Sequence, residues 1–306
     1  MSSVLVVGSV AYDSVETIRG KRDDMLGGSA TFFSRAASFF APVRVVAVVG
    51  DDFNDDDLNF LANSQVDFSG LQKQPGKTFR WGGVYADDFS TRKTLFTHLN
   101  VFEQFKPHIP AQLRRTPYVF LANIGPDLQL NVLSQMEKPK FVALDTMNFW
   151  IDRNPEILHK VLGRVNGLII NDEEAKMLTG ENNLIIAMRK IVAMGPEVLI
   201  VKKGEHGAVL LYQGEYFYLP AFPVEDLTDP TGAGDTFAGG FMGYLAAENN
   251  LSHKTLRNAV VLGSALASFT VTGFGVDRLK EIGREDVFDR YEKFRELTYF
   301  EFLDQM

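Results

Sequence analysis

Cysteine is absent from this chain of 306 residues, which also holds only two tryptophans and five histidines. Without thiols there can be no disulfide, thiolate nucleophile, iron–sulfur cluster or cysteine-bound zinc. The histidines are scattered along the chain, so a histidine metal site is not expected. The lack of cysteine fits a reducing compartment.

An excess of basic charge and long apolar runs are missing as well. Asp and Glu number 39 against 31 Lys and Arg, a net charge of -8, so neither nucleic acid nor an anionic membrane surface is an expected partner. The most apolar helical stretch, 258–273, is shorter than the ~20 residues that cross a bilayer. Residues 1–8 lack a basic segment and predict a core strand in place of a signal peptide, so we expect a cytoplasmic chain.

Short apolar runs alternate with helical patterns along most of the chain, whose 45% hydrophobic and 23% charged residues suit a globular core. This alternation predicts an α/β fold of three layers, with a mostly parallel sheet between helices. The expected strands are 4–7, 43–49, 118–121, 141–144, 167–170 and 198–201, and the expected helices are 29–40, 127–136, 155–162, 184–194, 232–248, 253–271 and 284–298.

One region departs from this alternation. Residues 77–85 and 91–102 resemble two strands joined by a turn at 87–90, and Gly82 and Gly83 predict a bulge. We interpret this region as a hairpin that projects from the main sheet. No repeat or long linker interrupts the chain, so a single domain over 1–306 with a small β excursion is expected.

A glycine loop from Asp229 to Asp235 is the sharpest local feature. Its small residues let backbone N–H groups approach a ligand, and the small apolar residues that follow predict a helix beginning there. An anion cradle at a helix N-terminus, with Asp235 in the first helical turn, is an arrangement suited to phosphoryl transfer. The alternative is a glycine-rich turn in which Asp235 only caps the helix.

This loop with its helix resembles the C-terminal signature of the ribokinase (PfkB) family of carbohydrate and nucleoside kinases. Further matches follow in family order over nearly the whole chain: Gly8 with Asp13, Gly27–Gly28, 171–175 with 178–180, and 203–204 with Gly207. The resemblance implies a ribokinase-like domain whose β lid, formed by about 12–19 and 77–102, covers the acceptor. It also implies a small-molecule acceptor, ATP and Mg²⁺, with K⁺ as a further candidate ion.

The resemblance assigns the catalytic roles to the glycine loop. Asp235 becomes the base that accepts the proton of the acceptor hydroxyl, and the amides of Gly232, Ala233 and Gly234 become the anion hole. These roles agree with the chemistry, because phosphoryl transfer depends on positioning and on charge stabilisation.

Nucleotide and metal roles follow from two further matches. Asn171 and Glu174 match an Asn-x-x-Glu element that holds Mg²⁺ and phosphate largely through water. The resemblance thus assigns Asn171, Lys202, Gly204 and Gly207 to the nucleotide and Glu174 to Mg²⁺ through water. The alternatives are structural: Asn171 and Glu174 could form the capping box of a helix over 172–178, and Lys202 could be a solvated surface lysine.

Asp13, Gly27 and Gly28 are matched to the acceptor, with Asp13 binding two hydroxyls. Phe32 is a departure, since the family pattern has Asn at this position, and it leaves two interpretations: an aromatic face toward the acceptor, or a core residue. Arg80 and Trp81 in the hairpin are candidates to stack on a ring of the acceptor.

The leading hypothesis is an ATP-dependent kinase that phosphorylates a hydroxyl of a small sugar or polyol. A nucleoside kinase is the alternative within the enzyme class, and a catalytically silent ligand-binding protein on the same fold is the alternative outside it. A homodimer formed through the lid is a further expectation from the resemblance.

Overall fold

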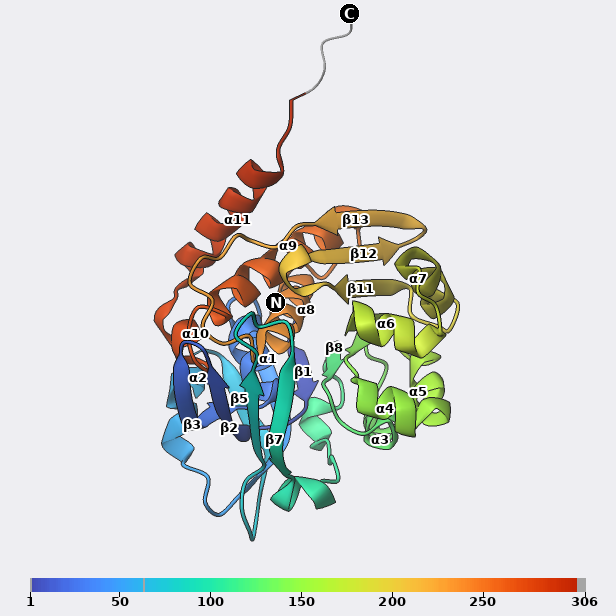
Figure 1. Ribbon diagram of the computed structural model, residues 1–306. Helices are drawn as coiled ribbons and strands as arrows, with labels where there is room; N and C mark the ends of the chain where they lie inside the picture. The colour runs from blue at the N-terminus through green and yellow to red at the C-terminus, as the bar shows by residue number, and fades with distance from the viewer. Residues whose placement is uncertain (1, 63, 302–306) are drawn as a thin grey trace, which may run out of the picture.

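The computed structural model describes residues 2–62 and 64–301, and a nine-stranded sheet runs through its centre (Figure 1). Seven neighbouring strands are parallel, and the last two pair antiparallel at one edge. In sheet order they are β13 (Glu215–Leu219), β12 (Ala208–Tyr212), β11 (Val198–Lys202), β10 (Gly167–Asn171), β9 (Phe141–Leu144), β8 (Tyr118–Leu121), β1 (Val4–Val7), β4 (Val43–Gly50) and β5 (Val66–Gln74).

Helices cover both faces of this sheet, as the alternation predicts. The strand side chains point alternately to the two faces, so Val4 and Val6 join one core while Leu5 and Val7 join the other. The first core includes α1 (Ser29–Ser38), α8 (Ala233–Glu248), α9 (His253–Thr270), α10 (Asp277–Glu281) and α11 (Arg284–Thr298). The second includes α3 (Pro126–Gln135), α4 (Asn148–Arg153), α5 (Pro155–Leu162), α6 (Asp172–Thr179) and α7 (Leu184–Val192).

Short helical turns fill the remaining connections. They are η1 (Asp55–Leu58), α2 (Asn59–Ala62), η2 (Asn100–Gln104), η3 (Ala111–Leu113) and η4 (Gly204–His206). Within the described ranges, no helix is both long and apolar enough to cross a membrane.

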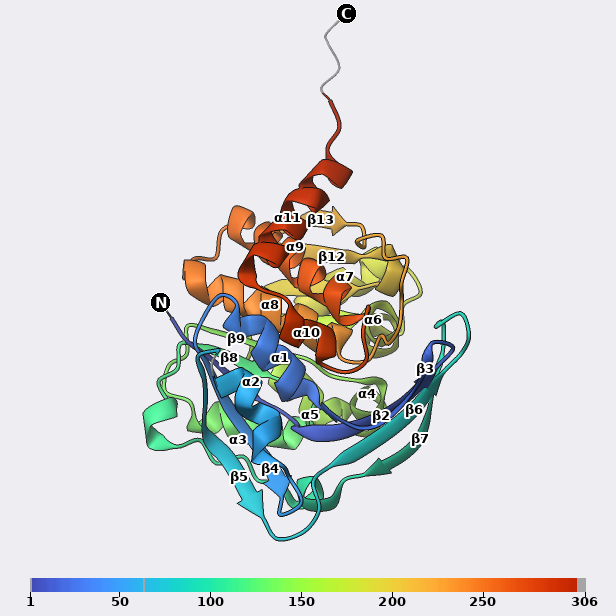
Figure 2. The same ribbon diagram turned by 90° about the vertical axis from the view of Figure 1, so that its left-hand side faces the viewer.

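A second, four-stranded sheet stands as a curved layer beside the body (Figure 2). Its order is β3 (Gly20–Gly27), β2 (Ala11–Thr17), β6 (Arg80–Tyr85) and β7 (Arg92–His98). The predicted hairpin is present with shorter strands, and its register shifts between Gly82 and Gly83, which confirms the predicted bulge. Strand β3 was not predicted from the sequence, because its residues 20–24 are polar and exposed and lack a strand pattern. We call this four-stranded sheet the lid.

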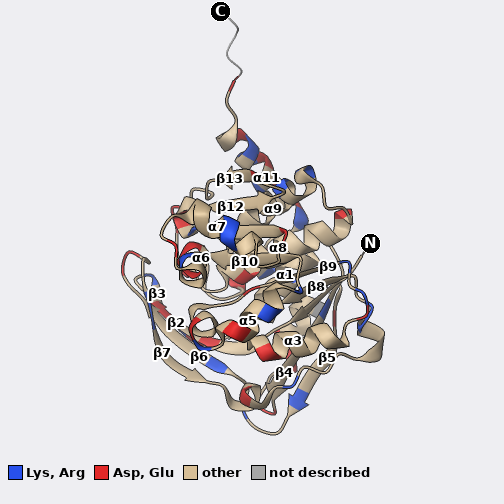
Figure 3. Cartoon of the chain, turned by 90° about the vertical axis from the view of Figure 1, so that its right-hand side faces the viewer, with Lys and Arg blue, Asp and Glu red and all other residues tan. Residues whose placement is uncertain are grey.

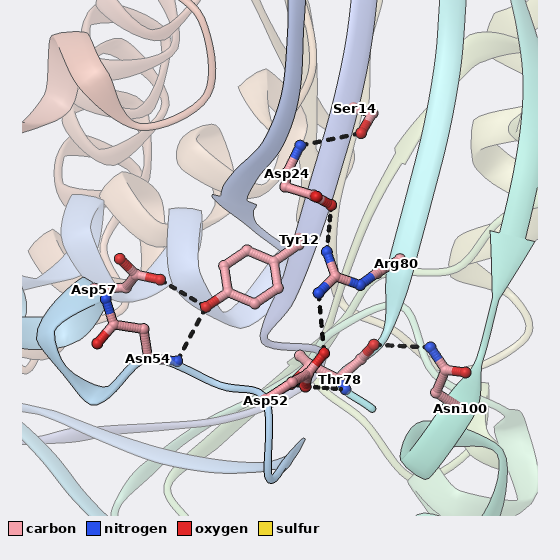
Figure 4. A network of polar contacts seen from close by, with 9 residues as sticks. All are labelled: Tyr12, Ser14, Asp24, Asp52, Asn54, Asp57, Thr78, Arg80 and Asn100. Atoms are coloured by element: carbon pink, nitrogen blue, oxygen red, sulfur yellow. Dashed lines mark hydrogen bonds and ion pairs between the residues drawn. The ribbon is translucent and has the colours of Figure 1, made fainter. Parts of the chain in front are cut away.

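A polar network joins the lid to the body (Figure 4). The guanidinium of Arg80 pairs with Asp24 within the lid and with Asp52 after β4, the second pair at 2.9 Å. Asp52 also accepts hydrogen bonds from the amide (2.6 Å) and the hydroxyl (2.7 Å) of Thr78. The Arg80 guanidinium lies 4.9 Å from the ring centroid of Tyr12. The hypothesis that Arg80 stacks on a ligand ring is therefore wrong. Two carboxylates pair with the guanidinium, and the ring of Tyr12 packs against its face.

Candidate active site

Several predicted site residues lie together where the parallel strands end. Asn171 and Lys202 are the last residues of β10 and β11 and are register partners. Asp145 directly follows β9. Ligands of open α/β sheets bind at this carboxyl edge. The N-terminus of α8 reaches the same edge, because Lys202 Nζ lies 2.8 Å from the position of a Cβ at Gly234, the residue before Asp235.

The glycine loop turns sharply into α8, and within it the Ala233 amide donates to the Pro230 carbonyl oxygen at 3.2 Å. Gly232 is the N-cap of α8 with a left-handed φ of 78°, and Asp235 lies in the first helical turn. A Cβ at Gly232 would lie 2.5 Å from the ring of Phe32, which is buried beneath the loop. Of the two interpretations of Phe32, the structure therefore shows the core residue: the ring supports the loop and does not face the acceptor.

A half-buried lysine lies among three carboxylates at this edge. Burial lowers the pKa of Lys202, but attraction to Asp145, Glu174 and Asp235 outweighs this effect and raises it. Burial, and then repulsion from Asp145, raises the pKa of Glu174 to about 7 and that of Asp235 to about 7. Burial also raises the pKa of Asp145. The interpretation of Lys202 as a solvated surface residue is wrong, because its charge is held by this cluster.

Asn171 and Glu174 form the capping box of α6. The Asn171 amide donates to Glu174 Oε2 at 2.8 Å, and the Glu174 amide donates to Asn171 Oδ1 at 2.7 Å. The box fixes both side chains at the sheet edge, while Glu174 Oε1 takes no part in it. A structural role and a ligand role are therefore compatible at this pair.

Asp13 lies on β2 and is buried against the glycine pair. The Gly28 amide donates to Asp13 Oδ2 at 3.3 Å, and a Cβ at Gly27 would lie 2.0 Å from the same oxygen. Gly28 has a φ of +88°. Burial raises the pKa of Asp13 to about 7. Glycine at both positions thus lets the chain pass close to a carboxyl whose charge is incompletely solvated.

Gly204 and Gly207 lie in the loop between β11 and β12, just after Lys202. Both have positive φ, of 56° and 89°. A Cβ at Gly207 would lie 2.0 Å from the Leu219 carbonyl oxygen, whereas nothing lies within 4 Å of a Cβ at Gly204. The close packing of the loop explains why glycine is needed at position 207. At Gly204 the backbone has free space where a side chain would lie.

Two lid residues near this site were missed by the sequence analysis. Arg92 on β7 lowers the pKa of Asp13 and of Asp235 through its positive charge. Its guanidinium lies 4.9 Å from the ring centroid of Trp81, so Trp81 stacks with this arginine. Tyr85, the register partner of Arg92, reaches Thr231 in the glycine loop. No signal in the sequence points to either residue, because only the strand register shows that Arg92 and Tyr85 lie side by side on neighbouring strands of the lid.

The arrangement fits a divalent cation held mainly through water. Asp145, Glu174 and Asp235 bring more negative charge than Lys202 balances. In residues 2–62 and 64–301, no group of three or more His, Asp or Glu side chains is placed to hold a metal directly. Mg²⁺ commonly keeps several waters and binds one or two carboxylates together with phosphates. Elsewhere acidic and basic residues are interspersed over the helices and the lid (Figure 3).

Comparisons with known proteins agree with this geometry. The cytidine kinase of Thermococcus kodakarensis is 32% identical over 249 residues, which cover 79% of this chain and 88% of that protein. The structure of the Methanocaldococcus jannaschii nucleoside kinase matches with a TM-score of 0.78 and 21% identity, over 96% of this chain and 99% of that one.

A ribokinase-family structure with bound nucleotide matches equally well. The Escherichia coli putative ribokinase II in complex with ATP and Mg²⁺ has a TM-score of 0.78 and 18% identity, over 96% of this chain and all (100%) of that one. The family model described as pfkB family carbohydrate kinase matches residues 1–282. This chain therefore belongs to the pfkB family of carbohydrate kinases, and its ribokinase-like fold is the one that the alternation of strands and helices predicts.

Proposed function

We propose that this chain transfers the γ-phosphoryl group of ATP to a hydroxyl of a small sugar or polyol, with Asp235 as the base. The observation that carries the proposal is the position of Asp235 in the first turn of α8, directly after the glycine loop whose Gly232 caps the helix. Family membership implies ATP, Mg²⁺ and a phosphotransferase with an alcohol acceptor.

Asp235 has the properties of a general base near neutral pH. Its pKa of about 7 places it where a base is both ionised and able to hold a proton. The acceptor hydroxyl gives its proton to this carboxylate as its oxygen attacks phosphorus. The glycine-loop amides and the Lys202 ammonium stabilise the negative charge on the transferring group.

Glu174 and Asn171 would hold Mg²⁺ through water, near the charge of Asp145. When bound, Mg²⁺ supplies neutralisation of phosphate charge. Lys202, Gly204 and Gly207, at and just after the end of β11, are proposed to bind the nucleotide, as the resemblance implies. We propose K⁺ as an additional activator, and the turnover assay in potassium and in choline salts tests it.

Asp13 with Gly27 and Gly28 is proposed to hold the acceptor. A buried carboxylate that accepts two hydroxyl hydrogen bonds favours a diol and disfavours analogues that leave it unpaired. Asp13 lies opposite Trp81 in the lid, so both border the same space. We therefore propose that the acceptor lies between the lid and Asp235.

A nucleoside is the second candidate acceptor. One observation favours it: the T. kodakarensis relative is a cytidine kinase. Trp81, the candidate to stack on a base, already packs against Arg92. A nucleoside also carries the ribose diol that Asp13 is proposed to bind. The sugar and nucleoside candidates differ only in the need for a planar base.

The test is an acceptor panel read by ADP release, with ribose, fructose and inositol compared with adenosine, inosine and cytidine. We expect Asp235→Asn to lose roughly a hundred- to ten-thousandfold in turnover while it still binds nucleotide. Asp13→Ala should lower kcat/KM for the acceptor and leave ATP binding intact. The matched control is Asp152→Asn, an exposed carboxylate on α4.

The outcomes separate the hypotheses. Turnover of Asp235→Asn within a few-fold of wild type would contradict the assignment of the base. Activity on nucleosides alone would replace the sugar with the second candidate. No turnover on any acceptor, with ligand binding retained, would support the silent binding protein. A cytoplasmic location stays a prediction that cell fractionation can check.

We also propose that the lid forms a homodimer. Strand β7 ends the four-stranded sheet of the described residues, and an edge strand can pair with a second copy. Leu95 and Leu99 near this edge are 53% and 39% exposed. Leu95→Glu should convert a dimer to a monomer in light scattering, and a monomeric wild type would contradict the proposal.

A further inference from the structure

The lid makes hydrogen bonds to the segment that leads into the anion hole, residues 227–231. Two of these bonds end on backbone carbonyl oxygens and one ends on a side chain. They are Thr17 Oγ1 to the Thr228 carbonyl (3.0 Å), Arg19 Nε to the Leu227 carbonyl (3.2 Å) and Tyr85 Oη with Thr231 Oγ1 (3.1 Å). The bond from Tyr85 lies closest in sequence to Gly232, the N-cap of α8.

Thr231 is held from its other side by a buried carboxylate. The Thr231 amide donates to Asp229 Oδ1 at 2.9 Å, and the Gly275 amide donates to Asp229 Oδ2 at 3.2 Å. Asp229 is fully buried (0% exposed) and cannot move freely. Thr231 thus stands between a fixed anchor and Tyr85, which belongs to the lid.

The tyrosine is suited to this contact. Tyr85 is the last residue of β6 and is half-buried. Burial raises the pKa of its hydroxyl, so the hydroxyl stays protonated and uncharged at neutral pH. An uncharged hydroxyl beside the loop adds no negative charge where phosphate would bind.

We propose that Tyr85 is a positioning residue whose hydrogen bond to Thr231 couples closure of the lid to the shape of the anion hole. The inference rests on the proposed function, since the hole matters only if phosphate is transferred there. When the lid lies over the acceptor, Tyr85 and Asp229 together fix Thr231 and the amides after it. A small displacement of such amides weakens the stabilisation of the transferring group. An open lid releases one of the two supports, so transfer to water without acceptor is disfavoured.

The first test is a double-mutant cycle on kcat with the best acceptor. Tyr85→Phe removes only the hydroxyl, and we expect it to lower kcat about 10- to 100-fold with the KM for ATP nearly unchanged. Thr231→Val should lower kcat at least as much, and Thr231→Ser, which keeps the hydroxyl, should stay close to wild type. The double variant should be no slower than Thr231→Val alone, because both changes break the same contact. Tyr218→Phe, at a tyrosine that is 59% exposed, is the matched control.

A second test does not depend on turnover. Amide hydrogen exchange in the peptide over 227–235 should be faster in Tyr85→Phe than in wild type and unchanged in Tyr218→Phe. Unchanged exchange in Tyr85→Phe, a kcat within twofold of wild type, or losses that multiply in the double variant would each overturn the inference. A wild type that phosphorylates no acceptor would instead contradict the proposed function, and the exchange experiment would still decide whether Tyr85 holds the loop.

Discussion

Asp235 and Asp13 share an electrostatic setting that differs from that of ordinary surface carboxyls. Burial raises the pKa of each to about 7, and Asp13 and Asp145 add repulsion at Asp235. Arg92 opposes these effects at both residues. A carboxylate whose pKa lies near 7 is a favourable base for proton transfer. Its partly buried charge, however, lowers the stability of the folded state once the group is ionised.

The pH dependence of the melting temperature should show this loss of stability. The pKa of Asp235 rises from an ordinary 3.8 to about 7 on folding, so the folded state binds the proton more tightly than the unfolded state. The raised pKa of Asp235 contributes its full stabilisation of the wild type below about pH 4, and this contribution is lost as the pH rises through about 7. Asp235→Asn should therefore raise Tm above pH 7, with an advantage that vanishes near pH 4. Melting curves across this range check the prediction, and an equal shift at all pH values would contradict it.

Arg92 should set the acid limb of the pH–rate profile. As the proposed base, Asp235 must be ionised to accept a proton, so kcat/KM should fall below about pH 7. Arg92→Gln removes a charge that lowers the pKa of both Asp13 and Asp235, so the limb should move to higher pH. Lys93→Gln, at the neighbouring position of β7, is the control and should leave the limb in place. A limb that stays fixed in Arg92→Gln would show that the arginine does not act on these carboxyls.

At the scale of elements, the start of α8 contains two glycines, Gly232 and Gly234, and glycine is required at each position for a different physical reason. Gly232 needs a left-handed φ and has no room for a Cβ above Phe32. At Gly234 a Cβ would approach only Lys202 Nζ, at 2.8 Å, which is the end of a flexible side chain. The first glycine serves the fold, and the second keeps space for the Lys202 ammonium.

Substitutions at these two glycines should separate stability from turnover. Gly232→Ala should lower Tm by several degrees, since strain and a steric clash with Phe32 add together. Gly234→Val should fold with a Tm near wild type and lose most turnover, because the side chain displaces Lys202 and crowds the anion hole. Calorimetry and the ADP-release assay measure the two effects. Normal kinetics in folded Gly234→Val would contradict the anion hole.

At the scale of the molecule, helix α11 lies beyond the residues matched by the family model and still belongs to the core. Phe294 of α11 is 1% exposed and meets Phe222, the two ring centroids lying 5.3 Å apart. Arg290 stacks between the rings of Phe222, at 4.3 Å, and Phe269, at 3.8 Å. Because Phe222 precedes residues 227–231 in the sequence, α11 packs on the stretch of chain that leads into that segment.

Removal of this contact should destabilise the whole domain. Phe294→Ala should cost about 3–5 kcal/mol of unfolding free energy, the usual range for a large buried aromatic. Phe300→Ala, at a ring that is 80% exposed, should be nearly neutral. Denaturant melts of the two variants give the comparison. A loss below about 1 kcal/mol in Phe294→Ala would show that α11 packs only loosely on the core.

Local patterns in the sequence were sufficient for much of this protein. Strands β1, β8 and β9 and helices α5 and α11 begin and end where the patterns predict, because strands buried on both faces need continuous apolar runs and helices need their own periodicity. The glycine loop, Asp235 and the capping box of α6 could also be found in the sequence, since each depends on neighbours within a few residues.

Contacts between distant segments were decided only by the tertiary structure. The grouping of Lys202 with Asp145, Glu174 and Asp235 follows from strand order and crossovers. The effect of Arg92 on Asp13 and Asp235 follows from the strand register of β7, which nothing within its own segment specifies. Strand β3 has the same origin, because pairing with β2 stabilises residues 20–24, whose local pattern indicates only an exposed polar segment. The ion pairs of Arg80 likewise join segments that are distant in the sequence.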